Sequence, residues 1–385
     1  MLSMKIVADE NIPCVAEAFA SLGEVALRPG RAMTPEDVRD ADILLVRSVT
    51  RVGPELLEGS RVQFVGSATI GFDHVDRDYL HARGIGFSTA PGSNATSAAE
   101  YVVSTLLLLA ERDVFTLAGK RVGIVGCGNV GSRVRDRLMT LGMNCMVNDP
   151  PLQAQGGDDD DDYVSLDDMA EADVITFHVP LTRDGDWPTW HLAGRQFLER
   201  LKTGAVLVNT ARGAAVDNVA LDRLLSVRDD LTVVLDVWEG EPAISETLLQ
   251  KVDIGTPHIA GYSLDGKLRG TDMIYQAACA HFDRSVDWQP VAALPERQVL
   301  ALEESANTTD ALRQAVWFAY NVRDDDARLR EMMTLPAGQR PQYFDRLRKE
   351  YPVRREFSET VIRLPAGNNE LERMLAALGF AVEAG

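Results

Sequence analysis

The sequence predicts an α/β protein in which one doubly wound unit interrupts another and a small α+β module follows. Three observations predict this fold class. Short apolar runs alternate with helix-like stretches through the first hundred residues. A second alternating series starts at residue 122, with a strand-like run that ends in closely spaced glycines. A loop rich in glycine and proline, Asp253–Gly261, then leads into another helix-like stretch, and the composition changes near residue 285.

The first unit is predicted to contain a parallel sheet. Its strand-like runs are Lys5–Ala8, Glu24–Leu27, Ile43–Arg47, Val62–Ser67 and Ile85–Ser88. Helix-like stretches between them include Val15–Leu22, Pro35–Arg39 and Val75–Arg83. We expect a flavodoxin-like α/β domain over residues 1–95 that resumes in a return segment over 257–285. Ser93–Arg112 and Leu264–Arg284 are the helices expected to cross between the units.

The inserted unit is organised around Val122–Gly131, which reads VGIVGCGNVG. A buried strand is expected to end at three glycines with G-x-G-x-x-G spacing, before a helix over Ser132–Leu141. Such a turn lets a pyrophosphate approach the backbone, and the free N–H groups at the helix start face the anion. A carboxylate about twenty residues later accepts ribose hydroxyls and repels a 2′-phosphate, which favours NAD over NADP. We therefore predict a Rossmann-type NAD-binding domain over 96–256, with these cofactor contacts: Gly126, Gly128, Asn129, Val130, Gly131 and Asp149.

Composition and charge exclude several function classes. The net charge of −19 argues against nucleic acid and anionic membranes as partners. The four cysteines are scattered singly, as expected in a reducing compartment, and no signal peptide is visible, so we expect a cytoplasmic protein. The acidic run Gly156–Asp162 lacks the alternating ligands of a calcium loop, and we expect it to be a solvated loop with no metal.

Three charged residues follow later strands or the returning loop. Arg212 comes after the strand-like run Ala205–Asn209, Glu241 comes after Thr232–Asp236, and His258 lies in TPHIAG. Ligands of open α/β sheets bind beyond the carboxyl ends of the strands, so we expect the three side chains to converge. Oxidation of a hydroxy acid needs a base, a cation for the carboxylate and a carboxylate that orients the base. For the glycine motif taken alone, the alternative interpretation is a tight turn in an unrelated α/β protein.

The chain resembles the D-isomer-specific 2-hydroxyacid dehydrogenase family. The resemblance covers residues 1–285 and rests on GIVGCGNVG, NTARGAAVD, LDVWEGEP and TPHIAG, in this order. It implies that Arg212 binds substrate, that Glu241 supports the histidine, and that His258 donates or accepts the proton. It also implies that Asp236 and Gly261 contact the nicotinamide end of NAD.

Further stretches resemble one branch of this family. VADENIP, VRSVT, VGSATIGFDHVD and HIAGYSLDGKLRGT, together with the extra C-terminal module over 286–385, are similar to members that oxidise 4-phosphoerythronate in pyridoxal phosphate biosynthesis. This implies substrate contacts from Ser48, Thr69 and Tyr262, and homodimerisation through the C-terminal module. Two alternatives stay open: a dehydrogenase of another phosphorylated hydroxy acid, such as 3-phosphoglycerate, and an NAD(H)-sensing co-repressor without enzymatic activity.

A phosphorylated substrate requires cations besides Arg212. Arg47, beside Ser48 at a predicted strand end, is the first candidate for the phosphate. A basic cluster in the C-terminal module is the second candidate, or else a solvated helix face; it consists of Arg346, Arg348, Lys349, Arg354 and Arg355. His178 ends a predicted strand near the cofactor, and we expect it to have a structural role.

Overall fold

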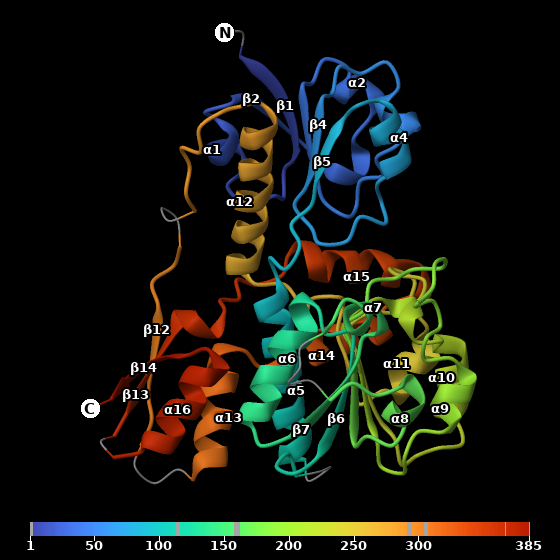
Figure 1. Cartoon of the computed structure of the whole chain (residues 1–385), viewed down its shortest axis with the longest axis vertical. Helices are drawn as coiled ribbons and strands as arrows, with labels where there is room; N and C mark the ends of the chain where they lie inside the picture. Colours follow the sequence, from blue (N-terminus) through green and yellow to red (C-terminus); the bar gives the residue numbers. More distant parts are fainter. Residues whose placement is uncertain are drawn as a thin grey trace. The chain divides into compact units, whose positions relative to one another are not determined.

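The computed structural model describes residues 3–112, 116–157, 162–290, 294–303, 307–365 and 367–384. The chain forms two compact units, shown in Figure 1. The first unit comprises Met1–Asn94 and Ser263–Glu296, and the second comprises Ala95–Tyr262 and Arg297–Gly385. Residues 158–161 of the predicted acidic loop lie outside the described residues.

The first unit contains a five-stranded parallel sheet with the order β2-β1-β3-β4-β5. This is the flavodoxin-like order, which confirms the predicted fold of this unit. Its strands are β1 (Met4–Asp9), β2 (Gly23–Arg28), β3 (Ile43–Val46), β4 (Phe64–Ser67) and β5 (Gly86–Ser88). Its helices are α1 (Val15–Phe19), η1 (Gly30–Ala32), α2 (Pro35–Val38), α3 (Pro54–Leu57), α4 (Arg77–Ala82) and α12 (Leu264–His281). The return helix α12 packs on β4, where Gly66 allows its close approach at Ile274.

The second unit contains a six-stranded parallel sheet with the order β11-β10-β9-β8-β6-β7. Its strands are β6 (Arg121–Val125), β7 (Asn144–Asn148), β8 (Val174–Phe177), β9 (Val206–Asn209), β10 (Thr232–Leu235) and β11 (Ile254–Gly255). Its helices up to residue 262 are α5 (Ala95–Glu111), α6 (Asn129–Thr140), α7 (Pro150–Ala154), α8 (Leu166–Met169), α9 (Arg195–Glu199), η2 (Gly213–Ala215), α10 (Asn218–Leu224) and α11 (Glu246–Lys251). The strand order reverses at β6, beside β8, and open α/β sheets bind ligands at such a point. The predicted Rossmann-type architecture is confirmed.

Helix α6 begins earlier than predicted. It starts at Asn129 rather than Ser132, directly after Gly128 at the N-cap position. The third glycine, Gly131, therefore lies inside the first helical turn, where a Cβ atom would stand 1.9 Å from the carbonyl oxygen of Gly126. Glycine is required there for the helix to pack against the turn, and this is why the helix can begin within the motif.

The C-terminal module contributes residues 297–385 to the second unit and forms a parallel sheet with the order β12-β13-β14. Its strands are β12 (Gln298–Ala301), β13 (Thr360–Leu364) and β14 (Ala381–Ala384). Its helices are α13 (Thr308–Ala319), α14 (Val322–Arg330), η3 (Glu331–Thr334), η4 (Ala337–Gln339), α15 (Arg340–Lys349), η5 (Phe357–Glu359) and α16 (Asn369–Leu378). Strand β12 was not predicted from the sequence, because it is largely exposed and carries no buried-strand pattern.

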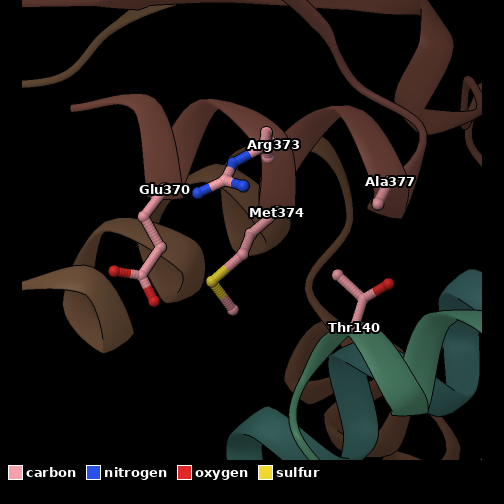
Figure 2. Close-up of a pocket in the computed structure, with 5 residues that line it drawn as sticks. All are labelled: Thr140, Glu370, Arg373, Met374 and Ala377. Atoms are coloured by element: carbon pink, nitrogen blue, oxygen red, sulfur yellow. The ribbon is translucent and has the colours of Figure 1, made fainter. Parts of the chain in front are cut away.

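The C-terminal module shares a hydrophobic core with α5 and α6. Side chains of α13 and α16 pack against these two helices, and the Ser104 hydroxyl donates to the Tyr320 carbonyl at 3.0 Å. A groove of about 240 Å³ remains between α6 and α16, and Figure 2 shows Thr140 and Met374 on its two sides. Because Thr140 is the last residue of α6, this groove lies at the opposite end of the helix from the glycine turn.

Glu100 is a fully buried carboxyl on α5, at the contact with the C-terminal module. Its Oε1 accepts the Phe357 N–H at 2.8 Å, and its Oε2 lies 3.6 Å from Arg354 Nη2. Burial raises the pKa of Glu100 to about 8, despite the opposing positive charge of Arg354. In the unfolded chain the Glu100 carboxyl has its ordinary, lower pKa. The folded protein therefore loses stability relative to the unfolded chain as the pH rises from that ordinary value toward 8.

Glu100→Gln is therefore expected to raise the melting temperature of the protein at pH 8.5 and to change it little near pH 5. Each kcal/mol of removed ionisation penalty corresponds to about 2–4 °C. Calorimetry across this pH range measures the effect, with exposed Glu370 on α16 replaced by glutamine as the control. A difference from wild type that does not depend on pH would contradict the elevated pKa.

No helix among the described residues is long and apolar enough to cross a membrane. The same residues contain no group of three or more His, Cys, Asp or Glu side chains placed to hold a metal ion.

Candidate active site

The three predicted catalytic residues follow three neighbouring strands of the second unit. Arg212 comes after β9, Glu241 after β10 and His258 after β11. The carboxyl ends of parallel strands meet at one edge of a sheet, so all three residues lie at that edge. The glycine turn after β6 opens on the same edge.

His258 and Glu241 are joined directly. The Nδ1 atom of His258 lies 2.8 Å from Oε2 of Glu241, and the two side chains are 31% and 20% exposed. The other carboxylate oxygen accepts the Trp238 N–H at 2.8 Å, which fixes the orientation of the carboxylate. Burial alone raises the pKa of Glu241, but the charge and hydrogen bond of His258, with Arg348 and the Trp238 N–H, outweigh burial and lower it. Glu241 is thus an anion that holds the imidazole with Nε2 directed away from it.

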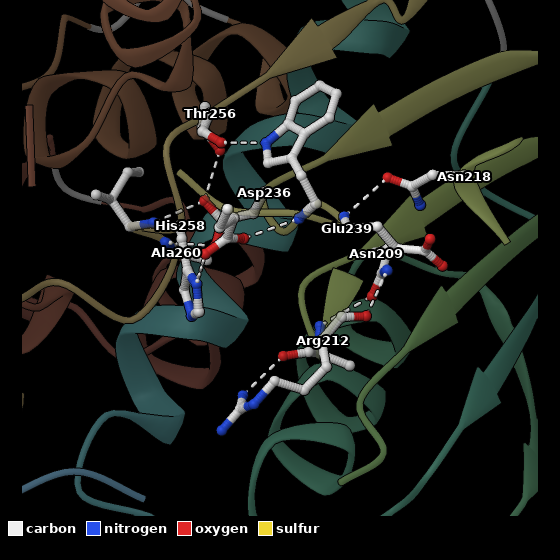
Figure 3. A network of polar contacts seen from close by, with 12 residues as sticks. Asn209, Arg212, Asn218, Asp236, Glu239, Thr256, His258 and Ala260 are labelled. Carbon is white, nitrogen blue, oxygen red and sulfur yellow. Dashed lines mark hydrogen bonds and ion pairs between the residues drawn. The ribbon is translucent and has the colours of Figure 1, made fainter. Parts of the chain in front are cut away.

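The backbone at His258 is held by Asp236. His258 has a φ of 59°, in the left-handed region, and its N–H donates to the Asp236 carbonyl at 2.7 Å. The Asp236 carboxylate accepts the N–H groups of Ile259 and Ala260 at 2.7 and 3.0 Å, and the Thr256 hydroxyl at 2.6 Å. Figure 3 shows this network. Burial raises the pKa of Asp236 although these donors and His258 oppose it. Asp236, the predicted nicotinamide contact, thus also holds the backbone of the segment that carries His258.

Arg212 lies in a tightly packed turn between β9 and η2. Asn209 Nδ2 donates to the Arg212 carbonyl at 3.0 Å, and its Oδ1 accepts the Ala211 N–H at 3.1 Å. At Gly213 a Cβ atom would stand 2.0 Å from the carbonyl carbon of Trp238, so this turn presses against the backbone that follows β10. Figure 3 shows Arg212 projecting from the turn, with its guanidinium also bonded to the Ala211 carbonyl at 2.8 Å.

The glycine turn has the shape that a dinucleotide requires. Gly126 has a φ of 89°, whereas a Cβ atom at Gly128 would meet no atom within 4 Å. Gly128 and Asn129 are exposed, so the first N–H groups of α6 are open to an anion. Asp149 accepts the N–H groups of Cys127 at 2.8 Å and Leu152 at 3.0 Å. Its carboxylate thereby stands beside the turn and keeps lone pairs for ribose hydroxyls. These residues fit NAD.

His178 lies directly after β8, and both of its ring nitrogens lie near hydroxyl groups. Its ring nitrogens lie 2.9 Å from the Thr176 hydroxyl and 3.2 Å from the Thr210 hydroxyl. Burial lowers the pKa of His178 to about 3, so the ring is neutral at physiological pH. Its backbone also packs against Gly126, which explains why the glycine turn tolerates no side chain there.

The predicted substrate residues of the first unit follow β3 and β4. Arg47 donates from Nε and Nη2 to fully buried Asp9, at 3.0 and 3.3 Å. Ser48 beside it is exposed. The Thr69 hydroxyl lies 2.9 Å from the Ser67 hydroxyl, which in turn lies 3.1 Å from Nε2 of His74. Arg47 is therefore held in place, and the Thr69 hydroxyl is oriented by a short polar chain.

Tyr262 in the second unit lies against the C-terminal module. The Arg348 guanidinium stands 5.7 Å from the centre of the Tyr262 ring, and Tyr351 packs edge-on against the same ring. Burial alone lowers the pKa of Arg348, but Tyr262 and Glu241 outweigh burial and raise it. The buried Nε atom of Arg348 has no hydrogen-bond partner among the described residues. Of the predicted basic cluster, Arg348 is thus a cation close to two candidate site residues.

Comparison with known proteins identifies the family of the chain. A family model described as D-isomer specific 2-hydroxyacid dehydrogenase, NAD binding domain, matches residues 94–260, and a domain of unknown function matches 293–379. The chain is 46% identical to an erythronate-4-phosphate dehydrogenase of Hahella chejuensis, over 98% of this chain and 99% of that protein. It is also 46% identical to one of Salmonella paratyphi B, over 98% of each.

The chain belongs to the D-isomer-specific 2-hydroxyacid dehydrogenase family. It is an NAD-dependent dehydrogenase, and the resemblance predicted from its motifs is confirmed.

Solved structures of the family support the fold. A D-lactate dehydrogenase from Aquifex aeolicus, complexed with NAD and lactic acid, has a TM-score of 0.61 at 24% identity, over 72% of this chain and 95% of that one. An NAD-bound 3-phosphoglycerate dehydrogenase from Entamoeba histolytica has a TM-score of 0.63 at 24% identity, over 76% of this chain and all of the other.

Several residues around the site were not predicted from the sequence. The Trp238 indole donates to the Thr256 carbonyl at 2.9 Å and thereby ties the segment after β10 to the segment after β11. Asn218 accepts the Glu239 N–H at 3.0 Å, as Figure 3 shows. Trp238 and Glu239 stand within the motif LDVWEGEP, so the motif itself was the available signal. Asn218 carried no such signal.

Proposed function

We propose that this protein catalyses the NAD-dependent oxidation of 4-phospho-D-erythronate to (R)-3-hydroxy-2-oxo-4-phosphooxybutanoate in pyridoxal 5′-phosphate biosynthesis. The observation that carries the proposal is the His258–Glu241 pair at the sheet edge where the glycine turn also opens. The full-length similarity to erythronate-4-phosphate dehydrogenases supports the choice of substrate.

His258 acts as the base in this reaction. Its Nε2 takes the proton of the C2 hydroxyl while the C2 carbon becomes a carbonyl, and NAD, when bound, accepts the hydride from C2. The Glu241 carboxylate, 2.8 Å from Nδ1, stabilises the imidazolium that results. Arg212 binds the C1 carboxylate of the substrate and polarises the developing carbonyl, because its guanidinium offers paired donors.

The other site residues take the roles that the family resemblance implies. Ser48, Thr69 and Tyr262 contact the substrate, and Asp236 and Gly261 lie at the nicotinamide end of NAD. Arg47 and Arg348 are the candidate ligands of the phosphate. The ion pair of Arg47 with Asp9 leaves Nη1 available for an anion, and Arg348 has a buried N–H that is unpaired among the described residues.

Arg47→Ala and Arg348→Gln are each expected to raise the KM for 4-phosphoerythronate by about 10–100-fold, since a charge-assisted hydrogen bond contributes about 1.5–3 kcal/mol. The KM for NAD should stay within about twofold. Steady-state kinetics with erythronate provide the control, because a substrate without phosphate should lose little in either variant. A variant with an unchanged KM for 4-phosphoerythronate would remove that arginine from the phosphate site.

A direct test of the function compares two phosphorylated substrates. The purified protein is expected to reduce NAD rapidly with 4-phosphoerythronate and slowly with 3-phosphoglycerate. Rapid turnover of 3-phosphoglycerate alone would overturn the proposal in favour of the first alternative. NADH binding with no turnover of either substrate would also overturn the proposed substrate.

We further propose that the protein is a cytoplasmic homodimer that assembles through the C-terminal module. Support comes from the family resemblance and from the largely exposed edge strand β12. Sedimentation of the full chain and of a variant with charged substitutions on β12 tests this assembly. A full chain that sediments as a monomer would contradict it.

A further inference from the structure

Arg354 of the C-terminal module contacts the backbone of both segments through which the chain passes between its two units. The chain enters the second unit at Ala95 and leaves it after Tyr262. Arg354 Nη2 donates to the Ser97 carbonyl at 2.7 Å, and Nη1 donates to the Ala260 carbonyl at 3.1 Å. One side chain therefore joins the start of α5 to the loop that carries His258.

This arginine is a buried cation. It is only 5% exposed, and its guanidinium carbon stands 3.5 Å from the centre of the Tyr320 ring. Burial alone lowers the pKa of Arg354, but Tyr320, Tyr351, Glu100 and Asp325 outweigh burial and raise it, so it stays charged. A buried charge is costly unless it is well paired, and here its bonds go to two backbone carbonyls.

At Ala260 the loop is held from two sides. The Asp236 carboxylate accepts the Ala260 N–H at 3.0 Å, while Arg354 donates to the carbonyl of the same residue. His258, two residues earlier, has a left-handed backbone. A non-glycine residue in that conformation persists only where the surrounding structure holds it. The two contacts at Ala260 supply part of this constraint.

We propose that Arg354 is a positioning residue for the dehydrogenase reaction, acting through the Ala260 backbone on His258. The C-terminal module thereby completes the active site of its own chain, in addition to any role in assembly. The inference rests on the proposed function for its kinetic part. Its structural part, the restraint of residues 256–262, is independent of the substrate.

The test uses Arg354→Gln, Arg354→Lys and a matched control, Arg363→Gln. Arg363 belongs to the same module, but its ion pair with Glu383 is exposed. Arg354→Gln is expected to lower kcat by about 10²-fold, the cost of a 1 Å misplacement of a catalytic group, with the KM for NAD within about twofold. Arg354→Lys should recover part of kcat, because an ammonium keeps the charge but lacks the planar fork. Hydrogen exchange of residues 256–262 should quicken in both Arg354 variants and not in the control.

Tyr320→Leu serves if Arg354→Gln does not fold, since it removes the ring beneath the guanidinium and leaves both hydrogen bonds possible. It should change kcat and hydrogen exchange in the same direction by a smaller factor. Unchanged exchange at residues 256–262, or a kcat equal to that of the control, would overturn the inference. A wild-type protein that does not oxidise 4-phosphoerythronate would instead contradict the proposed function, and the exchange measurement would still decide the role of Arg354.

Discussion

Replacement of His258 by alanine is expected to lower kcat by about 10²–10⁴-fold, the contribution typical of a positioned general base. The Nδ1 atom of His258 is paired with Glu241, so its Nε2 atom is left to face the substrate. Affinity for NADH should change less than about twofold, since the glycine turn and Asp149 form their contacts without this side chain. Steady-state kinetics and fluorescence titration with NADH measure the two quantities.

Glu241→Gln is the companion to that experiment. Glutamine keeps an acceptor for the Trp238 N–H but loses the negative charge that stabilises the imidazolium. We expect a smaller loss of kcat than in His258→Ala, because the base itself is still present. Loss of NADH binding in His258→Ala would show that the histidine maintains the fold and would contradict its role as the base.

Arg212→Gln is expected to lower kcat/KM for 4-phosphoerythronate by about 10²–10³-fold. Loss of one partner from a desolvated charge pair costs about 2–5 kcal/mol, much of it from the substrate carboxylate left unpaired. Arg212→Lys should recover little, because an ammonium cannot bind two carboxylate oxygens in parallel. Unlike a phosphate ligand, Arg212 should matter equally for erythronate without its phosphate.

The control for Arg212 is Arg223→Gln, at an exposed position on helix α10 of the second unit. Its kinetics should match the wild type. If Arg212→Gln lowered kcat/KM for 4-phosphoerythronate and left erythronate unaffected, Arg212 would be a phosphate ligand rather than the carboxylate ligand.

Local patterns predicted most of the fold. Strands β1 to β5 and the glycine turn were predictable because continuous apolar runs and glycine spacing depend on nearby residues alone. The start of α6 was misplaced by three residues, since the packing of Gly131 against Gly126 is a contact that spacing does not reveal. Strand β12 was missed because an exposed edge strand needs no apolar pattern.

In the candidate site too, the residues within local motifs were predictable, and the contacts between distant segments were not. The motifs singled out Arg212, Glu241 and His258, and the Glu241–His258 pair is present in the structure, although these roles remain predictions. The contact of Arg354 with Ala260 joins residues 94 positions apart, and a basic cluster in a helical segment resembles a solvated face in sequence. A sequence pattern does not reveal a contact between a side chain and a backbone atom that is distant along the chain.

The most direct test of the central claim is the fate of the hydrogen on C2 of the substrate. With 4-phospho-D-erythronate deuterated at C2 and unlabelled NAD, mass spectrometry of the reduced cofactor should find one deuterium per molecule, accompanied by an equal amount of the 2-oxo acid. Reduced cofactor without deuterium, or no reduced cofactor, would contradict direct hydride transfer from this substrate.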